Sequence, residues 1–525
     1  MPDVRFRGYL IKVKQFFLSL LLLFSVFAGS IDAQRTRPSQ RPATPAASAP
    51  AQTRPSFEVP FVNKTLPNGL EVIVLEDPSL PIVTVELAVR NGSFTEPPEL
   101  NGLSHLYEHM FFKTNLASLL FQCQPFLLRG GVNPICNEPM RLKDQIGDVS
   151  YLRDVDKLGI AQNGSTREEV VNYYFTTTSQ NLPTAVKIIN NAVRFPLFDQ
   201  QELENEKQIV IGELERNESN PFSYLFQELN NRLFFKYPTR KNPGGTRETV
   251  AAATTEKMRV IQSRYYFPNN AALIVTGDTK ADDVFKLVQD VMGSWEPRKV
   301  DAFKEFPLVE HPPLPKSTGV VIEKNTGEES QSEDQNVFVL LGWHGPSIGK
   351  DDASTYAADV FSYILSQPDH RFQRNLIDTG LASSVAINYY TQRNVGPITV
   401  FLITTPDKAK AALKAVYAEI AQFTDPKYFT DEELENSKNI LENLDLFDRE
   451  KPSEYSHTLG FWWSSTGIDY FRGYHKNLRA ASRADINRYI NTYITGKPRV
   501  GVALVAPGAK AKAALTEQDL TGGAK

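Results

Sequence analysis

The sequence predicts an α+β fold made of two tandem, similar domains. Strand-like and helix-like segments alternate from about residue 57 onwards, which is typical of sheets covered by helices. The order of these segments in the first half returns in the second half. Residues 198–209 also resemble residues 429–440, and both stretches contain Glu-Leu-Glu-Asn-x-Lys. A repeat of this length indicates duplicated domains rather than a solenoid.

Segments rich in β-branched and aromatic residues indicate the strands. They are residues 70–75, 82–89, 171–178 and 271–277 in the first half, and 336–342, 398–405 and 500–505 in the second. Apolar residues at spacings of three and four indicate the helices. Besides one helix that begins near residue 103, these are 182–194, 199–215, 282–292, 353–365, 408–423 and 430–446.

The N-terminus reads as an export signal rather than as part of the fold. Basic residues precede a short apolar run at 16–27, and small residues follow, so residues 1–33 are expected to be a signal peptide. The alternative is a retained membrane anchor, for which the run is short. We therefore expect a periplasmic or secreted protein with no stable membrane span after signal cleavage. Residues 34–56, rich in Pro, Ala, Ser and Thr, are expected to be a disordered spacer.

Composition and length set the remaining boundaries. A chain of 525 residues is too long for one ordinary core. We expect a first domain at 57–305, a Pro-rich linker at 306–318, a second domain at 319–510 and a tail at 511–525. The net charge of −4 gives no reason to expect nucleic acid or an anionic membrane as a partner.

The strongest chemical signal is His105-Leu106-Tyr107-Glu108-His109. Apolar residues around it recur at helical spacing, and Asn101-Gly102 can cap the start of that helix. His105 and His109 then lie one turn apart on the same side, as two zinc ligands would. Glu108 lies beside them, placed as a general base rather than as a ligand. The alternative is a core helix with two satisfied histidines and a surface glutamate.

A third ligand is needed, and the best candidates lie on helix 199–215. Glu206 and Glu213 are seven residues apart, so both face the same side of the helix. A carboxylate near a ligating histidine orients its ring and raises its basicity, which suits Glu206. The alternative for this pair is a solvated acidic helix face.

These motifs together resemble the pitrilysin/insulinase (M16) peptidases, especially the short branch that includes mitochondrial processing peptidase and bacterial zinc-bearing subunits. The resemblance runs from about Ser56 to Pro507 and rests on four segments in order: Leu66–Leu70, Gly102–Lys113, Asn163–Glu169 and Glu204–Glu213. It implies two α/β-sandwich domains of the M16 type, of which the second is catalytically inactive.

The resemblance also assigns roles to individual residues. It implies that His105, His109 and Glu213 bind Zn²⁺, that Glu108 is the catalytic base, and that Glu206 supports the site from behind the ligands. It implies that Asn163 and its strand line the cleft and pair with the substrate backbone. The alternative for Asn163 is a polar turn before a strand.

Two departures from the family pattern matter. An insertion at about 115–150 follows directly on the histidine helix and contains Cys123 and Cys136, which are either bonded to each other or free. This insertion is a loop over the cleft, a partner contact, or a change that harms the protein. In the second half, Leu376 and Ser383 stand where active members carry an Arg and a Tyr that stabilise the oxyanion.

We therefore expect an exported zinc-dependent endopeptidase that hydrolyses peptides or unfolded polypeptides. It would be the zinc-bearing subunit of a two-chain enzyme, in which a second M16-like subunit supplies the Arg/Tyr pair. The alternatives are a non-catalytic scaffold or peptide-binding subunit of the same fold, and a zinc-binding holdase for unfolded peptides.

Overall fold

The computed structural model describes residues 59–121, 155–156, 158–324 and 336–523. All of them belong to one compact unit, Ser56–Lys525. The predicted signal peptide and spacer lie outside the described residues, as do Cys123, Cys136 and most of the predicted insertion.

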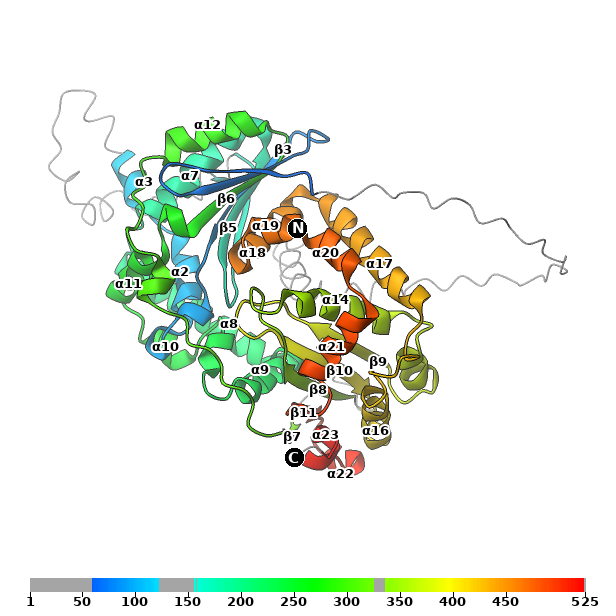
Figure 1. Cartoon of the computed structure of the whole chain (residues 1–525). Helices are drawn as coiled ribbons and strands as arrows, with labels where there is room; N and C mark the ends of the chain where they lie inside the picture. The colour runs from blue at the N-terminus through cyan, green and yellow to red at the C-terminus, as the bar shows by residue number, and fades with distance from the viewer. Residues whose placement is uncertain (1–58, 122–154, 157, 325–335, 524–525) are drawn as a thin grey trace, which may run out of the picture. The chain divides into compact units, whose positions relative to one another are not determined.

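The first half contains a six-stranded sheet in the order β1-β2-β6-β3-β5-β4 (Figure 1). Neighbouring strands are antiparallel except for β2 and β6, which are parallel. Alternate residues of β3, Val83, Val85, Leu87 and Val89, are fully buried in the main core of this half. The strands are β1 Val62–Thr65, β2 Glu71–Glu76, β3 Ile82–Val89, β4 Ala161–Thr166, β5 Val171–Thr178 and β6 Ala271–Gly277. Strand β4 therefore forms one edge of this sheet.

Helices cover the core face of the first sheet. Among them, α2, α7 and α12 bury apolar stripes such as Leu103, Leu106 and Met110 of α2. The helices of this half are α2 Leu103–Phe111, α3 Leu116–Phe121, α7 Leu182–Arg194, α8 Gln200–Ser219, α9 Pro221–Leu233, α10 Arg247–Ala251, α11 Thr255–Tyr265, α12 Ala281–Met292 and α13 Ala302–Glu305.

The second half repeats this plan with a five-stranded sheet in the order β7-β11-β8-β10-β9. Its strands are β7 Thr318–Glu323, β8 Val337–His344, β9 Ser384–Tyr389, β10 Pro397–Thr404 and β11 Val500–Val505. Its helices are α14 Asp352–Ser366, α15 Arg371–Gln373, α16 Ala409–Ile420, α17 Asp431–Arg449, α18 Pro452–Ser465, α19 Ile468–Arg472, α20 Tyr474–Ala480, α21 Arg483–Tyr493, α22 Lys510–Ala513 and α23 Glu517–Thr521. The predicted α+β fold of two similar halves is confirmed.

The two halves exchange equivalent helices. Helix α9, which follows α8, packs on β8 and β11 of the second sheet, where Leu225 and Leu229 are fully buried. Helix α18, which follows α17, packs on β3 and β6 of the first sheet, where Leu459 is fully buried (Figure 1). Gly460 permits the close approach, because a Cβ there would lie 2.8 Å from an oxygen of Glu86 on β3. Each half thus completes the core of the other.

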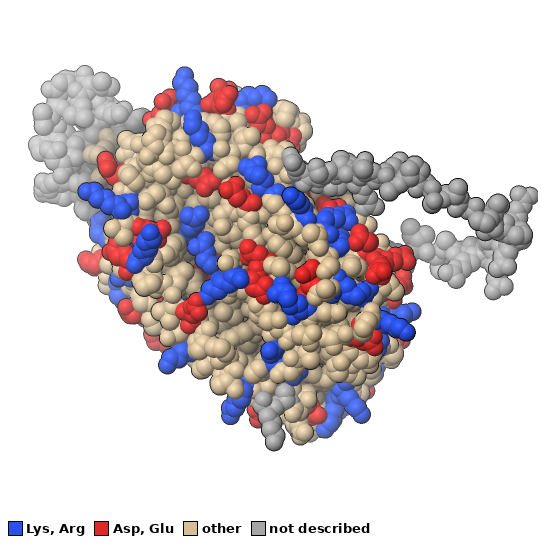
Figure 2. Space-filling model, in the orientation of Figure 1, with Lys and Arg blue, Asp and Glu red and all other residues tan. Residues whose placement is uncertain are grey.

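The end of the chain is part of the second half. The residues after 510, expected as a tail, form α22 and α23. Leu520 is fully buried against the second core, and the Tyr417 hydroxyl donates to its carbonyl at 2.6 Å. In the part of the chain that the structure describes, no helix is both long and apolar enough to cross a membrane. On the face shown in Figure 2, acidic and basic side chains are interspersed.

Candidate metal centre

The start of α2 is held by a carboxylate from the preceding loop. Glu96 is buried, and its two oxygens accept the backbone N–H of Gly102 at 2.7 Å and of Ser104 at 2.6 Å. Gly102 is the N-cap residue of α2, within the pair Asn101-Gly102 that was expected to cap it, but no side chain caps the helix from this position. Asn101 instead donates to Glu96 and to two backbone carbonyls of the 239–242 segment. Glu96 satisfies N–H groups that the helix itself leaves open.

Glycine is required at position 102. Its φ of +84° is left-handed, and a Cβ there would lie 2.6 Å from the Cα of Gly245. The backbone of the loop before α10 therefore packs directly on the first turn of α2. His105 follows immediately, so this close contact fixes where the first imidazole stands.

Helix α8 brings the acidic residues to α2. Asp199 caps α8 by accepting the N–H of Glu202 at 2.9 Å, and Leu203 and Val210 anchor the helix in the core. The helices α2 and α8 pack against each other. Glu206 and Glu213 are separated by two turns and both face α2, as their spacing predicts.

The side chains of His105, His109 and Glu213 converge. One ligand atom from each lies within 4.8 Å of the others. Glu213 Oε2 is 3.5 Å from His105 Nε2 and 3.6 Å from His109 Nε2. The imidazole rings stand edge to face with centroids 4.9 Å apart. Two imidazole nitrogens and one carboxylate oxygen at these distances fit the donor set of a zinc site that keeps a position open.

Glu206 stands behind the second histidine. Its Oε2 lies 2.9 Å from His109 Nδ1, and its Oε1 lies 2.6 Å from Lys113 Nζ. Burial disfavours the charged imidazole, but the hydrogen bonds that it donates to Glu206 and Glu213 outweigh burial and raise the pKa of His109 to about 9. Burial also raises the pKa of Glu206, but His109 and Lys113 outweigh it, so the pKa falls below its usual value. The negative charge of this pocket is thus suited to a cation.

Glu108 lies against the edge strand β4. Its side chain is buried, and Oε2 accepts the Thr166 hydroxyl at 3.0 Å. A Cβ at Gly164 would lie 2.7 Å from Glu108 Oε1, so the strand backbone touches this carboxylate. Thr166, Gly164, Lys113 and Glu96 were not predicted from the sequence. Lys113, Gly164 and Thr166 do lie within the segments Gly102–Lys113 and Asn163–Glu169 that carry the resemblance, whereas Glu96 lies outside them.

Asn163 is on β4 but does not share the face of Glu108. It is half-buried, and it pairs in register with Tyr174 of β5. Since side chains alternate along a strand, Asn163 and Ser165 face away from α2, while Gly164 and Thr166 face toward it. The alternative considered for Asn163, a polar turn before a strand, is not what the structure shows, since residues 161–166 form a strand.

The second half has no comparable set at the equivalent positions. Ser437 of α17 is buried and donates to the carbonyl of Leu434, and Leu444 offers no ligand atom. Leu376 is fully buried in the second core, and the Ser383 hydroxyl donates to the carbonyl of Ile403 at 3.4 Å. These side chains therefore do not replace the Arg and Tyr of the family pattern.

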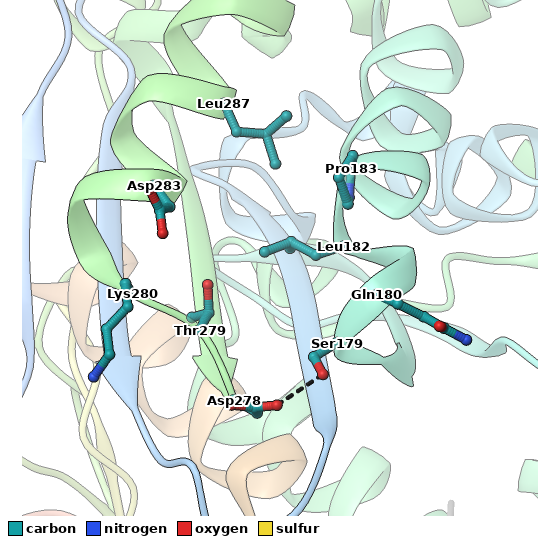
Figure 3. Close-up of a pocket in the computed structure, with 9 residues that line it drawn as sticks. All are labelled: Ser179, Gln180, Leu182, Pro183, Asp278, Thr279, Lys280, Asp283 and Leu287. Atoms are coloured by element: carbon teal, nitrogen blue, oxygen red, sulfur yellow. Dashed lines mark hydrogen bonds between the residues drawn. The ribbon is translucent and has the colours of Figure 1, made fainter.

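A separate pocket lies between the start of α7 and the start of α12 (Figure 3). It has a volume of about 430 Å³. Two of its lining residues are joined by a hydrogen bond of 2.8 Å, which the Ser179 hydroxyl donates to Asp278. Leu182 and Leu287 form its apolar part. None of the predicted site residues lines this pocket.

Comparison with known proteins identifies related chains. A model of the insulinase family, peptidase family M16, matches residues 71–118 and 145–245, so the match is interrupted within the region of the predicted insertion. A model of the peptidase M16 inactive domain matches residues 252–441. Together the two matches cover more than half of the chain.

Individual relatives agree with these matches. A Bacillus subtilis protein named uncharacterized zinc protease YmxG is 24% identical over 72% of this chain and 81% of its own length. The zinc protease PqqE of Helicobacter pylori is 22% identical over 82% of this chain and 89% of its own length. The crystal structure of a protease from Helicobacter pylori shares the fold, with a TM-score of 0.70 at 20% identity over 85% of this chain and 99% of that one. The chain belongs to the M16 family of peptidases.

Proposed function

We propose that this protein is a zinc-dependent endopeptidase that hydrolyses peptides or unfolded polypeptides. The observation that carries the proposal is the convergence of His105, His109 and Glu213 beside the buried carboxylate of Glu108. Two relatives with most of their length matched are named zinc proteases, which supports the same class of reaction.

In this proposal His105, His109 and Glu213 hold the metal. Zinc bound there would act as a Lewis acid and allow a water molecule to lose a proton near neutral pH. Glu206 fixes the ring of His109 through Nδ1 and keeps its Nε2 directed at the site. The three ligand side chains are 14–23% exposed, which leaves room for water and substrate to approach.

Glu108 accepts the proton of the attacking water and later delivers it to the leaving amine. Its carboxylate is held by Thr166 at one oxygen and packed on Gly164 at the other. The base is therefore fixed relative to β4. Among the described residues β4 is the edge strand, and an extended substrate that pairs with it would lie next to both the base and the ligands.

We further propose that the enzyme acts after export and as one subunit of a pair. The basic and apolar N-terminal segment supports export. The second half provides Leu376 and Ser383 where an Arg and a Tyr would stabilise the oxyanion, and oxyanion donors contribute about two to three orders of magnitude in rate. A second M16-like chain would supply them.

The test combines metal analysis with cleavage of an unstructured peptide. Glu108→Gln should retain zinc and lose cleavage by at least about a hundredfold, because only the proton acceptor is removed. Glu99→Gln, an exposed carboxylate shortly before α2, is the matched control and should behave like wild type.

Two results would count against the proposal. Unchanged cleavage in Glu108→Gln would exclude this residue as the base. If the zinc-loaded protein cleaves no peptide, with or without its native partner, the peptidase function is excluded and the scaffold or peptide-binding role remains.

A further inference from the structure

His457 of α18 reaches from the second half onto the first sheet, next to the edge strand. Its Nδ1 lies 2.5 Å from Glu86 Oε2, and its ring stands 4.3 Å from the ring of Tyr174. The side chain of His457 is 16% exposed. The hydrogen-bond contacts of the ring are made by Nδ1, and no hydrogen bond joins Nε2 to another described residue.

Glu86 holds the charge of His457 in place. Glu86 is fully buried in β3, and it also accepts hydrogen bonds of 2.7 Å from Ser456 and Asn172. Burial disfavours the charged imidazole, but Glu86 outweighs burial and raises the pKa of His457 above its usual value. The contact with Glu86 therefore favours the charged imidazolium form of His457, in which Nε2 also carries a proton.

This ion pair is exposed on one side only, since the side chain of His457 is 16% exposed and that of Glu86 is fully buried. Elsewhere in this interface α18 contributes buried apolar side chains such as Leu459 and Trp463, although the indole N–H of Trp463 also donates to Glu71 at 2.8 Å. Burying a carboxylate is costly, and a wholly structural contact could use apolar residues at lower cost. The exposed side of the pair borders Tyr174, which pairs in register with Asn163 of β4.

The geometry of strand addition places substrate side chains on this face. A peptide paired with β4 would lie about 10 Å from β5, two strand spacings away, with alternate side chains on each face of the sheet. One set would face α2. The other set would face α18, across the short side chains of Asn163 and Ser165.

We propose that His457 is a specificity-determining residue, whose Nε2–H binds the carboxylate of a glutamate side chain in the substrate. The glutamate would occupy a position whose side chain points away from Glu108. A glutamate side chain is one methylene longer than an aspartate side chain and so extends farther across Asn163 and Ser165. This inference rests on the proposed peptidase function.

The test uses zinc-loaded enzyme as isolated from its native host. A set of unstructured peptides of uncharged residues carries a single glutamate, aspartate or glutamine at successive positions around one cleavage site. We expect kcat/KM to be about tenfold higher for glutamate than for glutamine at one position, the contribution of one charge-assisted hydrogen bond. Absence of such a preference in the wild-type enzyme overturns the inference.

Two variants distinguish recognition of a substrate glutamate by His457 from a purely structural role of this residue. Glu86→Gln combined with His457→Gln removes both charges and keeps the side-chain volumes, so buried Glu86 is not left unpaired. The double variant should cleave the glutamine peptides as wild type does, but it should lose the preference for glutamate. His457→Lys keeps a positive charge and should keep much of that preference. Equal losses for all peptides would show a purely structural role. An enzyme that cleaves none of the peptides would overturn the proposed function itself.

Discussion

Glu96 shows how one buried side chain positions the candidate metal centre. It is 1% exposed and accepts two backbone N–H groups of the first turn of α2, directly before His105. Burial raises the pKa of Glu96 to about 7, although the hydrogen bonds from Ser104, Gly102 and Asn101 oppose this shift. The first imidazole therefore depends on a carboxylate from outside its helix.

We predict that Glu96→Gln lowers the stability of the protein by about 1–2 kcal/mol, because an amide leaves one of the two N–H groups without its acceptor. The melting temperature and the zinc affinity, from competition with a chromogenic chelator, should both fall. Glu99→Gln, exposed and close by in sequence, is the control. Identical melting temperatures for the two variants would contradict this account of Glu96.

At the scale of single residues, the sequence predicted the candidate ligands but not their surroundings. Helical spacing places His105 with His109, and Glu206 with Glu213, on one face of each helix. The family resemblance then implied which of the two glutamates is the ligand. Glu96, Gly164 and Thr166 act on α2 from other segments, and no local pattern links them to it. The resemblance of Asn163 to a family motif did not tell which face of β4 its side chain would take.

Strand β4 and helix α18 show which elements escape a search for periodicity. Residues 161–166, Ala-Gln-Asn-Gly-Ser-Thr, lack apolar alternation because the strand is an edge and little of it enters the core. Helix α18 packs on the sheet with one side, while Trp462 on its other side contacts Tyr470 and Tyr474. Its apolar residues therefore do not form a single stripe.

The contact between β4 and α2 predicts a backbone-dependent loss of activity. In Gly164→Ala the new Cβ would lie 2.7 Å from Glu108 Oε1, so either the carboxylate or the strand must move. We expect cleavage to fall by about a hundredfold, as for other small displacements of catalytic groups, with zinc content unchanged.

The control for this change is Gly473→Ala, between α19 and α20. A Cβ there meets its nearest neighbour at 3.4 Å, an ordinary contact, and φ is −87°. It should cleave as wild type does. Wild-type cleavage by Gly164→Ala would show that β4 does not restrain Glu108.

The stability of the contact between α18 and the first sheet should depend on pH through Glu86 and His457. Burial raises the pKa of Glu86, but His457, Asn172 and Ser456 outweigh it, so the pKa lies below the ordinary 4.5. The pKa of His457 lies above the ordinary 6.5. Glu454, Arg167 and Tyr174 also face this pair.

The direction of the pH dependence of stability follows from these two pKa shifts. The contribution of Glu86 is complete above 4.5 and is lost as pH falls through its lowered pKa, whereas that of His457 is complete below 6.5 and is lost as pH rises through its raised pKa. The difference in melting temperature between wild type and the Glu86→Gln, His457→Gln double variant should therefore be largest between pH 4.5 and 6.5, with wild type the more stable. A constant difference from pH 4 to 9 would contradict a charged pair.

Across the whole molecule, the exchange of α9 and α18 ties the halves together. The duplication was visible in the sequence, but the exchange was not, because a repeat shows that two segments are alike and not which sheet each covers. Leu225 and Leu229 fill the core of the second half, while Leu459 fills that of the first. Neither sheet has both faces covered by its own half.

We predict that the halves cannot fold apart. A fragment ending at residue 305 would expose the apolar face of α9 and the sheet face that α18 covers, so it should aggregate when expressed alone. The complementary fragment should behave in the same way, and co-expression should yield a soluble complex on size-exclusion chromatography.

The control is the full chain with a protease site inserted at the exposed Glu310 and cut after folding. Its pieces should remain associated, because the same helices are already exchanged. A first half that is monomeric alone and unfolds cooperatively would show that the exchange is dispensable.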